Sequence, residues 1–211
     1  MACRGSDFAP HLTAGRRGSD EEHEMSENVA LIEAKSGLPP TEATLSLRSR
    51  PGNQIRMSFG ELLSAEQIIP EMKATERWPA IVELIDLLVS LGKIKPPDRD
   101  SILASLKQRE ETMSTGIGFG IAIPHCSSDR LTEVVAAFGR SSKGIEFDAL
   151  DNAPVKFVVL FIVPKNQFQT HLRTLASIAK FLNDRATRDR LANAKSPEEI
   201  LGIFRDRADK A

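Results

Sequence analysis

A histidine that follows a glycine-rich segment is the feature of this chain best suited to chemistry. In "TGIGFGIAIPH", residues 115–125, Gly116, Gly118 and Gly120 precede a short apolar run that leads to His125. An imidazole is largely neutral near pH 7, so His125 could be a structural residue, a metal ligand, a catalytic base or a nucleophile that carries a phosphoryl group. The glycines either make a tight turn or expose main-chain N–H groups that an anion can approach closely.

The other motifs expected of metal, cofactor or hydrolase sites do not accompany this histidine. His125 and His171 have no Asp or Glu at ligand spacing, and the chain contains no H-x-x-x-H or C-x-x-C. The G-x-G-x-G spacing matches neither a dinucleotide fingerprint nor a Walker loop, and no G-x-S-x-G elbow occurs. We therefore expect no metal and no cofactor. Strand alternation should turn Cys126 away from His125, as a small apolar filler.

The composition indicates one ordinary domain and excludes several classes of partner. The chain has 211 residues, 41% of them hydrophobic, and 28 Lys and Arg against 29 Asp and Glu. This balance gives no basic surface for nucleic acid. The longest apolar run, residues 157–163, is too short to cross a membrane, and Cys3 and Cys126 cannot form a disulfide framework. A cytoplasmic protein without membrane insertion is expected.

The composition changes near Met57. Residues 1–56 contain a single aromatic residue, Phe8, within an irregular mixture of Ser, Gly, Pro and charged residues. Too little apolar surface is present to offset the entropy of ordering. We predict a disordered N-terminal extension over residues 1–56 and a folded domain over residues 57–211.

Within that domain, helical and extended patterns alternate. Apolar residues recur at helical spacing in four segments, while three others are short, apolar and extended. In the last helix, Ser196 is a predicted N-cap, Pro197 takes the first helical position and Glu199 completes a capping box. The alternation predicts an α/β layer fold around one sheet. The predicted helices cover residues 78–92, 96–111, 166–183 and 195–204, and the predicted strands residues 120–125, 131–140 and 155–163.

Three separated blocks resemble one known family. Residues 109–125, 143–155 and 171–182 ("REETMSTGIGFGIAIPH", "KGIEFDALDNAPV" and "HLRTLASIAKFL") are similar to the enzyme IIA domain of the bacterial phosphotransferase system, of the fructose–mannitol and nitrogen-regulatory type. The resemblance extends over residues 57–211. It implies an α/β fold in which a single mixed β-sheet is flanked by helices on both faces.

The resemblance also implies roles for the candidate residues. His125 would accept a phosphoryl group from the histidine-containing phosphocarrier protein, with Arg109 and His171 beside the phosphorylated ring. The guanidinium of Arg109 has the charge and planar shape that suit phosphoryl oxygens, and His171 lies near a helix start, where the macrodipole favours an anion. The three glycines would let the chain pass close under the site. One departure is Phe119, where nitrogen-type members usually carry Asn.

Three roles are compatible with this resemblance. The preferred one is a nitrogen-type regulatory enzyme IIA whose phosphorylated and free forms bind different target proteins, because the chain contains no recognisable enzyme IIB, IIC or phosphocarrier segment. The second is a sugar-transport enzyme IIA that passes the phosphoryl group to a fructose- or mannitol-type enzyme IIB. The third is a non-catalytic module that keeps the fold and binds partners without phosphoryl transfer.

Overall fold

The computed structural model describes residues 59–206, except for the side chains of residues 168–171. The predicted disordered extension, residues 1–56, lies outside the described residues, and so does the predicted start of the domain at Met57. The disorder assignment and this boundary therefore stay predictions.

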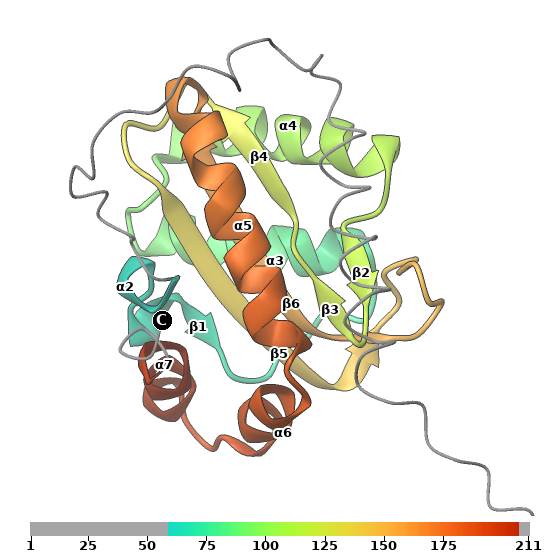
Figure 1. The fold of residues 1–211 in the computed structure, drawn as a ribbon. Helices are drawn as coiled ribbons and strands as arrows, with labels where there is room; N and C mark the ends of the chain where they lie inside the picture. The colour runs from blue at the N-terminus through green and yellow to red at the C-terminus, as the bar shows by residue number, and fades with distance from the viewer. Residues whose placement is uncertain (1–58, 207–211) are drawn as a thin grey trace, which may run out of the picture.

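One six-stranded mixed sheet forms the centre of the domain (Figure 1). Along the sheet the order is β1-β5-β6-β3-β2, and β4 also pairs with β6, beyond the end of β3. The pairs β1–β5, β3–β6 and β4–β6 are parallel, whereas β5–β6 and β2–β3 are antiparallel. The strands are β1 (Ile68–Ile69), β2 (Gly116–Gly118), β3 (Ile121–Ala122), β4 (His125–Ser128), β5 (Val135–Ile145) and β6 (Val155–Pro164).

Helices cover both faces of this sheet, which confirms the predicted fold class. Helices α3 and α4 pack on one face, and α2, α5, α6 and α7 pack on the other. The helices are α2 (Phe59–Leu62), α3 (Arg77–Ser90), α4 (Arg99–Thr112), α5 (Phe168–Asn183), α6 (Arg185–Asn193) and α7 (Pro197–Arg205), with 3₁₀ turns η2 (Ala65–Gln67), η3 (Pro96–Asp98) and η4 (Lys165–Gln167).

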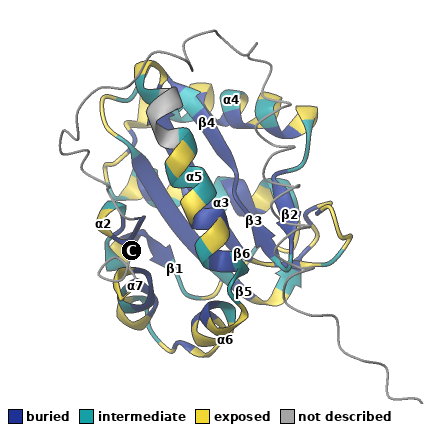
Figure 2. Ribbon diagram, viewed as in Figure 1, coloured by how far each residue is buried: buried dark blue, intermediate teal, exposed yellow. Residues whose placement is uncertain are grey.

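The sheet separates the hydrophobic core into two halves, and its central strand β6 is buried and contributes side chains to both (Figure 2). Its side chains alternate between the faces, so Phe161 contacts the α5 side while Leu160 contacts the α3 and α4 side. A strand buried on both faces needs a continuous apolar run, which explains the sequence of residues 155–163. The inward positions predicted for the first helix are fully buried: Ile81, Leu84, Ile85 and Leu88.

The strand predicted over residues 120–125 is interrupted in the structure. Strand β3 ends at Ala122 and β4 begins at His125, and both pair with β6. Pro124 has no N–H to donate, although its carbonyl oxygen accepts from Phe161 N at 3.0 Å. His125 is therefore the first residue of a strand, and the prediction that it ends one is wrong.

Two further details differ from the predictions. Strands β1 and β2 and helix α6 were not predicted, because β1 and β2 have only two or three residues and α6 is largely polar. At α7 the Ser196 hydroxyl accepts from Glu199 N as predicted, but the Glu199 carboxylate accepts from Lys195 N, one residue before the cap. Within residues 59–206, no helix is long and apolar enough to span a membrane.

Candidate functional site

His125 lies at the first position of β4 and is only 7% exposed. It is in register with Phe161 on the neighbouring strand β6, so the two side chains leave the sheet on the same face. That face is the one covered by α5. The side chain of Cys126 points to the opposite face, among residues that pack against α3 and α4, as predicted.

One ring nitrogen of His125 is held by the main chain. Nδ1 lies 2.8 Å from the carbonyl oxygen of Ile123. A carbonyl oxygen only accepts hydrogen bonds, so Nδ1 carries the proton of the neutral ring. Nε2 is then the nitrogen with a free lone pair, and the orientation of the ring is fixed by a residue two positions earlier in the chain.

The surroundings of His125 keep its ring neutral. The pKa of His125 is lowered from 6.5 to about 4, mainly by burial and also by the positive charge of Arg109, while the hydrogen bond to Ile123 opposes these two effects. Nε2 is therefore unprotonated throughout the neutral pH range. A neutral, oriented imidazole is the state that a nitrogen nucleophile requires.

Arg109 belongs to the last turn of α4, close enough to His125 for its charge to act on the ring. Its Nη1 donates to the carbonyl oxygen of Met113 at 2.9 Å, which holds the half-buried guanidinium near the start of the glycine segment. Burial lowers the pKa of Arg109, and the adjacent Glu110 carboxylate opposes this. The guanidinium thus supplies a positive charge that can act on an anion bound at His125.

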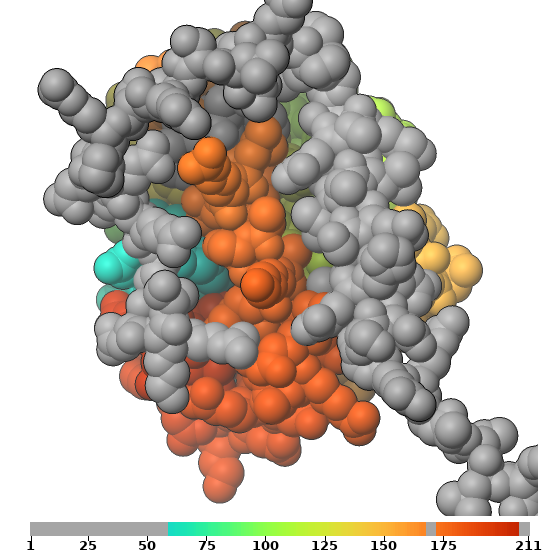
Figure 3. Space-filling model, in the orientation of Figure 1, coloured from blue at the N-terminus to red at the C-terminus, as the bar shows by residue number. Residues whose placement is uncertain are grey.

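His171 lies in the first turn of α5, the helix that crosses the face to which His125 points. The outer side of this helix, with Arg173, Ser177 and Lys180, is exposed to solvent (Figure 3). The side chain of His171 is outside the described part of the molecule. Its contact with the ring of His125 remains a prediction.

Each glycine of the segment has a local structural reason. A Cβ at Gly116 would lie 2.8 Å from Cα of Ala149, so only glycine allows the two backbones to approach so closely. Gly118 and Gly120 have φ angles of +93° and +75°, in the region that favours glycine. These contacts account for the glycines without an anion, and their predicted part in holding a phosphoryl group stays a prediction.

Phe119, between the second and third glycines, is held by two contacts in an unusual backbone conformation. It has a positive φ of 56°, unusual for an aromatic residue. Its N–H donates to Oδ2 of Asp151 at 2.8 Å, and its ring lies under the guanidinium of Arg188. The turn is therefore tied both to the loop after β5 and to α6, and an apolar ring occupies its tip.

The buried thiol of Cys126 does not offer an alternative nucleophile in the structure. Burial raises the pKa of the Cys126 thiol to about 12, so the thiol stays protonated and is a poor nucleophile. In the part of the chain that the structure describes, no three His, Cys, Asp or Glu side chains are grouped to hold a metal ion.

A buried carboxylate that was not predicted, Glu110, also belongs to this site. Glu110 is 6% exposed, and both its oxygens accept from Thr115, Oε1 from the N–H at 2.9 Å and Oε2 from the hydroxyl at 2.8 Å. A signal was present, because Glu110 follows Leu103 and Leu106 at helical spacing on the inward side of α4. An acidic residue at an apolar helix position indicates a specific buried partner.

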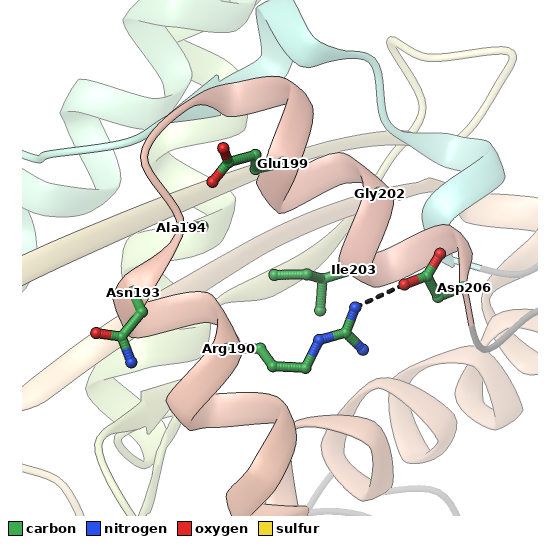
Figure 4. Close-up of a pocket in the computed structure, with 7 residues that line it drawn as sticks. All are labelled: Arg190, Asn193, Ala194, Glu199, Gly202, Ile203 and Asp206. Carbon is green, nitrogen blue, oxygen red and sulfur yellow. Dashed lines mark hydrogen bonds and ion pairs between the residues drawn. The ribbon is translucent and has the colours of Figure 1, made fainter.

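A surface hollow of about 410 Å³ lies elsewhere, between α6 and α7 (Figure 4). Arg190 spans it and forms an ion pair with Asp206, with Nη2 and Oδ2 2.6 Å apart. None of its lining residues contributes to the surroundings of His125. The candidate site is consequently the ring of His125 with Arg109, rather than this hollow.

The match to a family model agrees with this arrangement. Residues 61–207 match the model described as phosphoenolpyruvate-dependent sugar phosphotransferase system, EIIA 2. The chain belongs to this family. The EIIA resemblance inferred from residues 109–125, 143–155 and 171–182 is thereby confirmed.

Relatives of this EIIA domain include both sugar-type and nitrogen-regulatory proteins. The fructose-specific EIIA component of Haloferax volcanii is 37% identical over 144 residues, which cover 68% of this chain and 89% of that protein. The nitrogen regulatory protein of Pseudomonas aeruginosa is 38% identical over 150 residues, 69% of this chain and 97% of that protein. These nearly equal identities do not favour either type.

A solved structure shows the same fold in a complex. It is the complex of enzyme IIAMTL and phosphorylated enzyme IIBMTL from Escherichia coli. The match has a TM-score of 0.59 and 25% identity, and covers 69% of this chain and 98% of the matched chain. The single mixed sheet with helices on both faces is thus the EIIA fold.

Proposed function

We propose that this EIIA domain is a phosphoryl carrier that accepts its phosphoryl group on Nε2 of His125, from the histidine-containing phosphocarrier protein. The observation that carries the proposal is the bond of Nδ1 to the oxygen of Ile123, which leaves Nε2 as the nucleophilic nitrogen of a neutral ring. The phosphotransferase family of the chain supports the same chemistry.

The transfer can be written with balanced bonds and charges. The lone pair of Nε2 attacks phosphorus while the bond from phosphorus to the donor's ring nitrogen breaks, and that nitrogen keeps the bonding electrons. The proton on Nδ1 remains on His125, where the oxygen of Ile123 accepts its hydrogen bond. No metal is required, because the incoming group is already activated as a phosphohistidine.

Arg109 is the group proposed to stabilise the charge that develops on the phosphoryl oxygens. It is the last basic residue of α4, and its charge already acts on the ring of His125 in the free protein. A donor fixed before the reaction needs no reorganisation during transfer. His171 is proposed as a second hydrogen-bond donor to the phosphoryl oxygens. Main-chain N–H groups around Gly116, Gly118 and Gly120 are proposed as further donors.

The test is phosphorylation with purified enzyme I, the phosphocarrier protein and phosphoenolpyruvate. We expect one phosphoryl group per chain, lost in acid and kept in base, as phosphoramidates are. The His125→Gln variant should fold and accept none, whereas His125 should carry the label in a His171→Gln variant. Labelling of the His125→Gln variant, or a wild-type chain that binds the phosphocarrier without accepting phosphate, would contradict the proposal.

For the downstream step we propose the nitrogen-type regulatory role, in which the phosphorylated and free forms bind different target proteins. The Pseudomonas aeruginosa relative supports it. The alternative, transfer to an enzyme IIB, is supported by the fructose-specific relative and by the IIA–IIB complex from Escherichia coli. Mixing the phosphorylated chain with purified fructose- and mannitol-type enzymes IIB distinguishes the two roles. If the phosphoryl group stays on this chain, the result agrees with the regulatory role. Rapid transfer of the phosphoryl group to an enzyme IIB would establish the transport role.

A further inference from the structure

Four hydrogen bonds, arranged as three successive links, connect a buried carboxylate to the ring of His125. The carboxylate of Glu110 accepts from both the N–H and the hydroxyl of Thr115. The carbonyl oxygen of Thr115 accepts from Ile123 N at 3.0 Å. The carbonyl oxygen of Ile123 lies 2.8 Å from Nδ1 of His125. The chain of contacts therefore runs from α4, across the start of β2, to the first residue of β4.

The placement of Glu110 is costly unless these contacts are kept. Burial disfavours its charge and raises its pKa, while the two bonds from Thr115 and the charges of Arg77 and Arg109 lower it. The nearer guanidinium contact is to Arg77, whose Nη1 lies 3.9 Å from Oε1. Arg77 also pairs with the exposed carboxylate of Asp148, with Nη2 and Oδ2 3.2 Å apart.

We propose that Glu110 is a positioning residue for phosphoryl transfer: it fixes Thr115, Thr115 fixes Ile123, and the oxygen of Ile123 holds the ring of His125 with Nε2 presented to the donor. This inference deepens the proposed function and rests on it for its effect on transfer. Its effect on the ring itself does not, because the hydrogen bonds exist without phosphate.

The shape of the side chain, rather than its charge alone, is what this role requires. A Gln side chain has the same length, so its Oε1 can accept from Thr115 N while its Nε2 donates to the Thr115 hydroxyl, which can also accept. An Asp side chain keeps the charge but is one methylene shorter, so the carboxylate withdraws from both donors. Glu110→Gln and Glu110→Asp thus separate geometry from charge.

The test combines ring spectroscopy and transfer rates for these two variants. Two-bond ¹⁵N–¹H spectra of the imidazoles report which nitrogen of His125 carries the proton. We expect Glu110→Gln to keep the Nδ1–H form and accept phosphate within about 3-fold of wild type. Glu110→Asp should lose part of this form and accept phosphate on the order of 10-fold more slowly, the effect of weakening one hydrogen bond in a buried network. Glu111→Gln, at the exposed neighbouring position of α4, is the matched control and should change neither property.

The outcomes distinguish this inference from the proposed function. The positioning role of Glu110 would be overturned if Glu110→Asp had the wild-type ring spectrum and the wild-type rate. It would also be overturned if the spectrum of the His125 ring changed more in Glu110→Gln than in Glu110→Asp, because charge rather than geometry would then matter. A lower thermal midpoint with an unchanged His125 spectrum would likewise reduce Glu110 to a stabilising residue. If wild type accepts no phosphate, the proposed function fails, yet the spectra still decide whether Glu110 orients the ring.

Discussion

The guanidinium carbon of Arg188 lies 5.5 Å from the centre of the Phe119 ring, over its face. Arg188 also donates from Nη1 to the carbonyl oxygens of Leu182 and Asn183, at the C-terminal end of α5. One side chain of α6 therefore links the tip of the glycine turn to the helix that covers the face of His125. The link joins segments that are more than sixty residues apart in sequence.

The contact between Phe119 and Arg188 should appear as an energetic coupling. In a double-mutant cycle of Phe119→Ala and Arg188→Gln, we expect a coupling of about 0.5–1 kcal/mol in the free energy of unfolding, the usual value of a cation–π contact. Urea denaturation of the four proteins measures it. Arg185→Gln, on an exposed residue of the same helix, should combine additively with Phe119→Ala. Additivity in both cycles would show that the stacking contributes nothing.

The pKa of His125 should make stability depend on pH. Its folded-state pKa, about 4, is below the unfolded value of 6.5, so the unfolded chain binds more protons between these limits. Stability should therefore fall as the pH drops from 6.5 to 4, by up to about 3 kcal/mol from this residue. Urea denaturation of wild type and His125→Gln at several pH values measures the effect. Because the carboxylates titrate in both proteins, the difference between their free energies of unfolding reports His125 alone. An NMR titration in which the ring protonates near pH 6.5 would contradict it.

Replacing Arg109 with Lys should slow phosphate acceptance by on the order of 10-fold. Lysine keeps the positive charge but loses the planar group that can hold the oxygen of Met113 and a phosphoryl oxygen together. The initial rate of labelling measures the effect. Arg99→Lys, at the opposite end of the same helix, is the control and should label at the wild-type rate. Equal rates for the two variants would show that the transfer does not need the planar guanidinium of Arg109.

His171 should assist the transfer without carrying the phosphoryl group. Loss of one hydrogen bond to a charged oxygen in His171→Gln should slow acceptance by on the order of 10- to 100-fold, with the label still on His125. Mass spectrometry under neutral conditions locates the modified residue. Label on His171 in the wild-type chain would reverse the assignment of carrier and helper.

The close approach at Gly116 should make this position intolerant of alanine. The added Cβ would lie 2.8 Å from Cα of Ala149, a backbone atom that cannot turn aside, so we expect destabilisation by about 1–3 kcal/mol. Gly202 is the contrasting position, since a Cβ there meets nothing within 4 Å and α7 is helical. Gly202→Ala should stabilise by about 0.5–1 kcal/mol. Thermal denaturation of both variants checks the pair, and equal effects would contradict it.

The elements that the sequence predicts correctly are those whose apolar pattern is strong. Leu84 and Leu88 mark the inward face of α3, and the apolar run before Pro164 marks the central strand β6. Helix α6 was not predicted, because Leu191 is its only large buried apolar residue and one such residue gives no helical pattern. Its position depends instead on tertiary contacts, among them Arg140 of β5, whose Nη1 donates to the carbonyl oxygen of Leu191 at 2.8 Å.

Some residues of the candidate site could likewise be predicted from the sequence, and others could not. His125 and Arg109 were predicted from a motif, because residue types and their spacing can be read directly from the sequence. The contacts of Glu110 with Thr115 and of Phe119 with Arg188 were not, because they depend on where α4 ends and on how α6 packs. A motif therefore identifies the residue proposed to react, while the groups proposed to orient it become evident only from the fold.

The break between β3 and β4 has a consequence for how a partner must meet this protein. The break ends at His125, whose main chain is immediately paired with β6, the strand at the centre of the sheet. A histidine on a loop can swing toward a donor, but this one is anchored by strand pairing at its main chain and by the Nδ1 hydrogen bond at its ring. In the proposed transfer, the recipient therefore fixes the approach path, and the docking partner must make the whole displacement that brings its own histidine to His125.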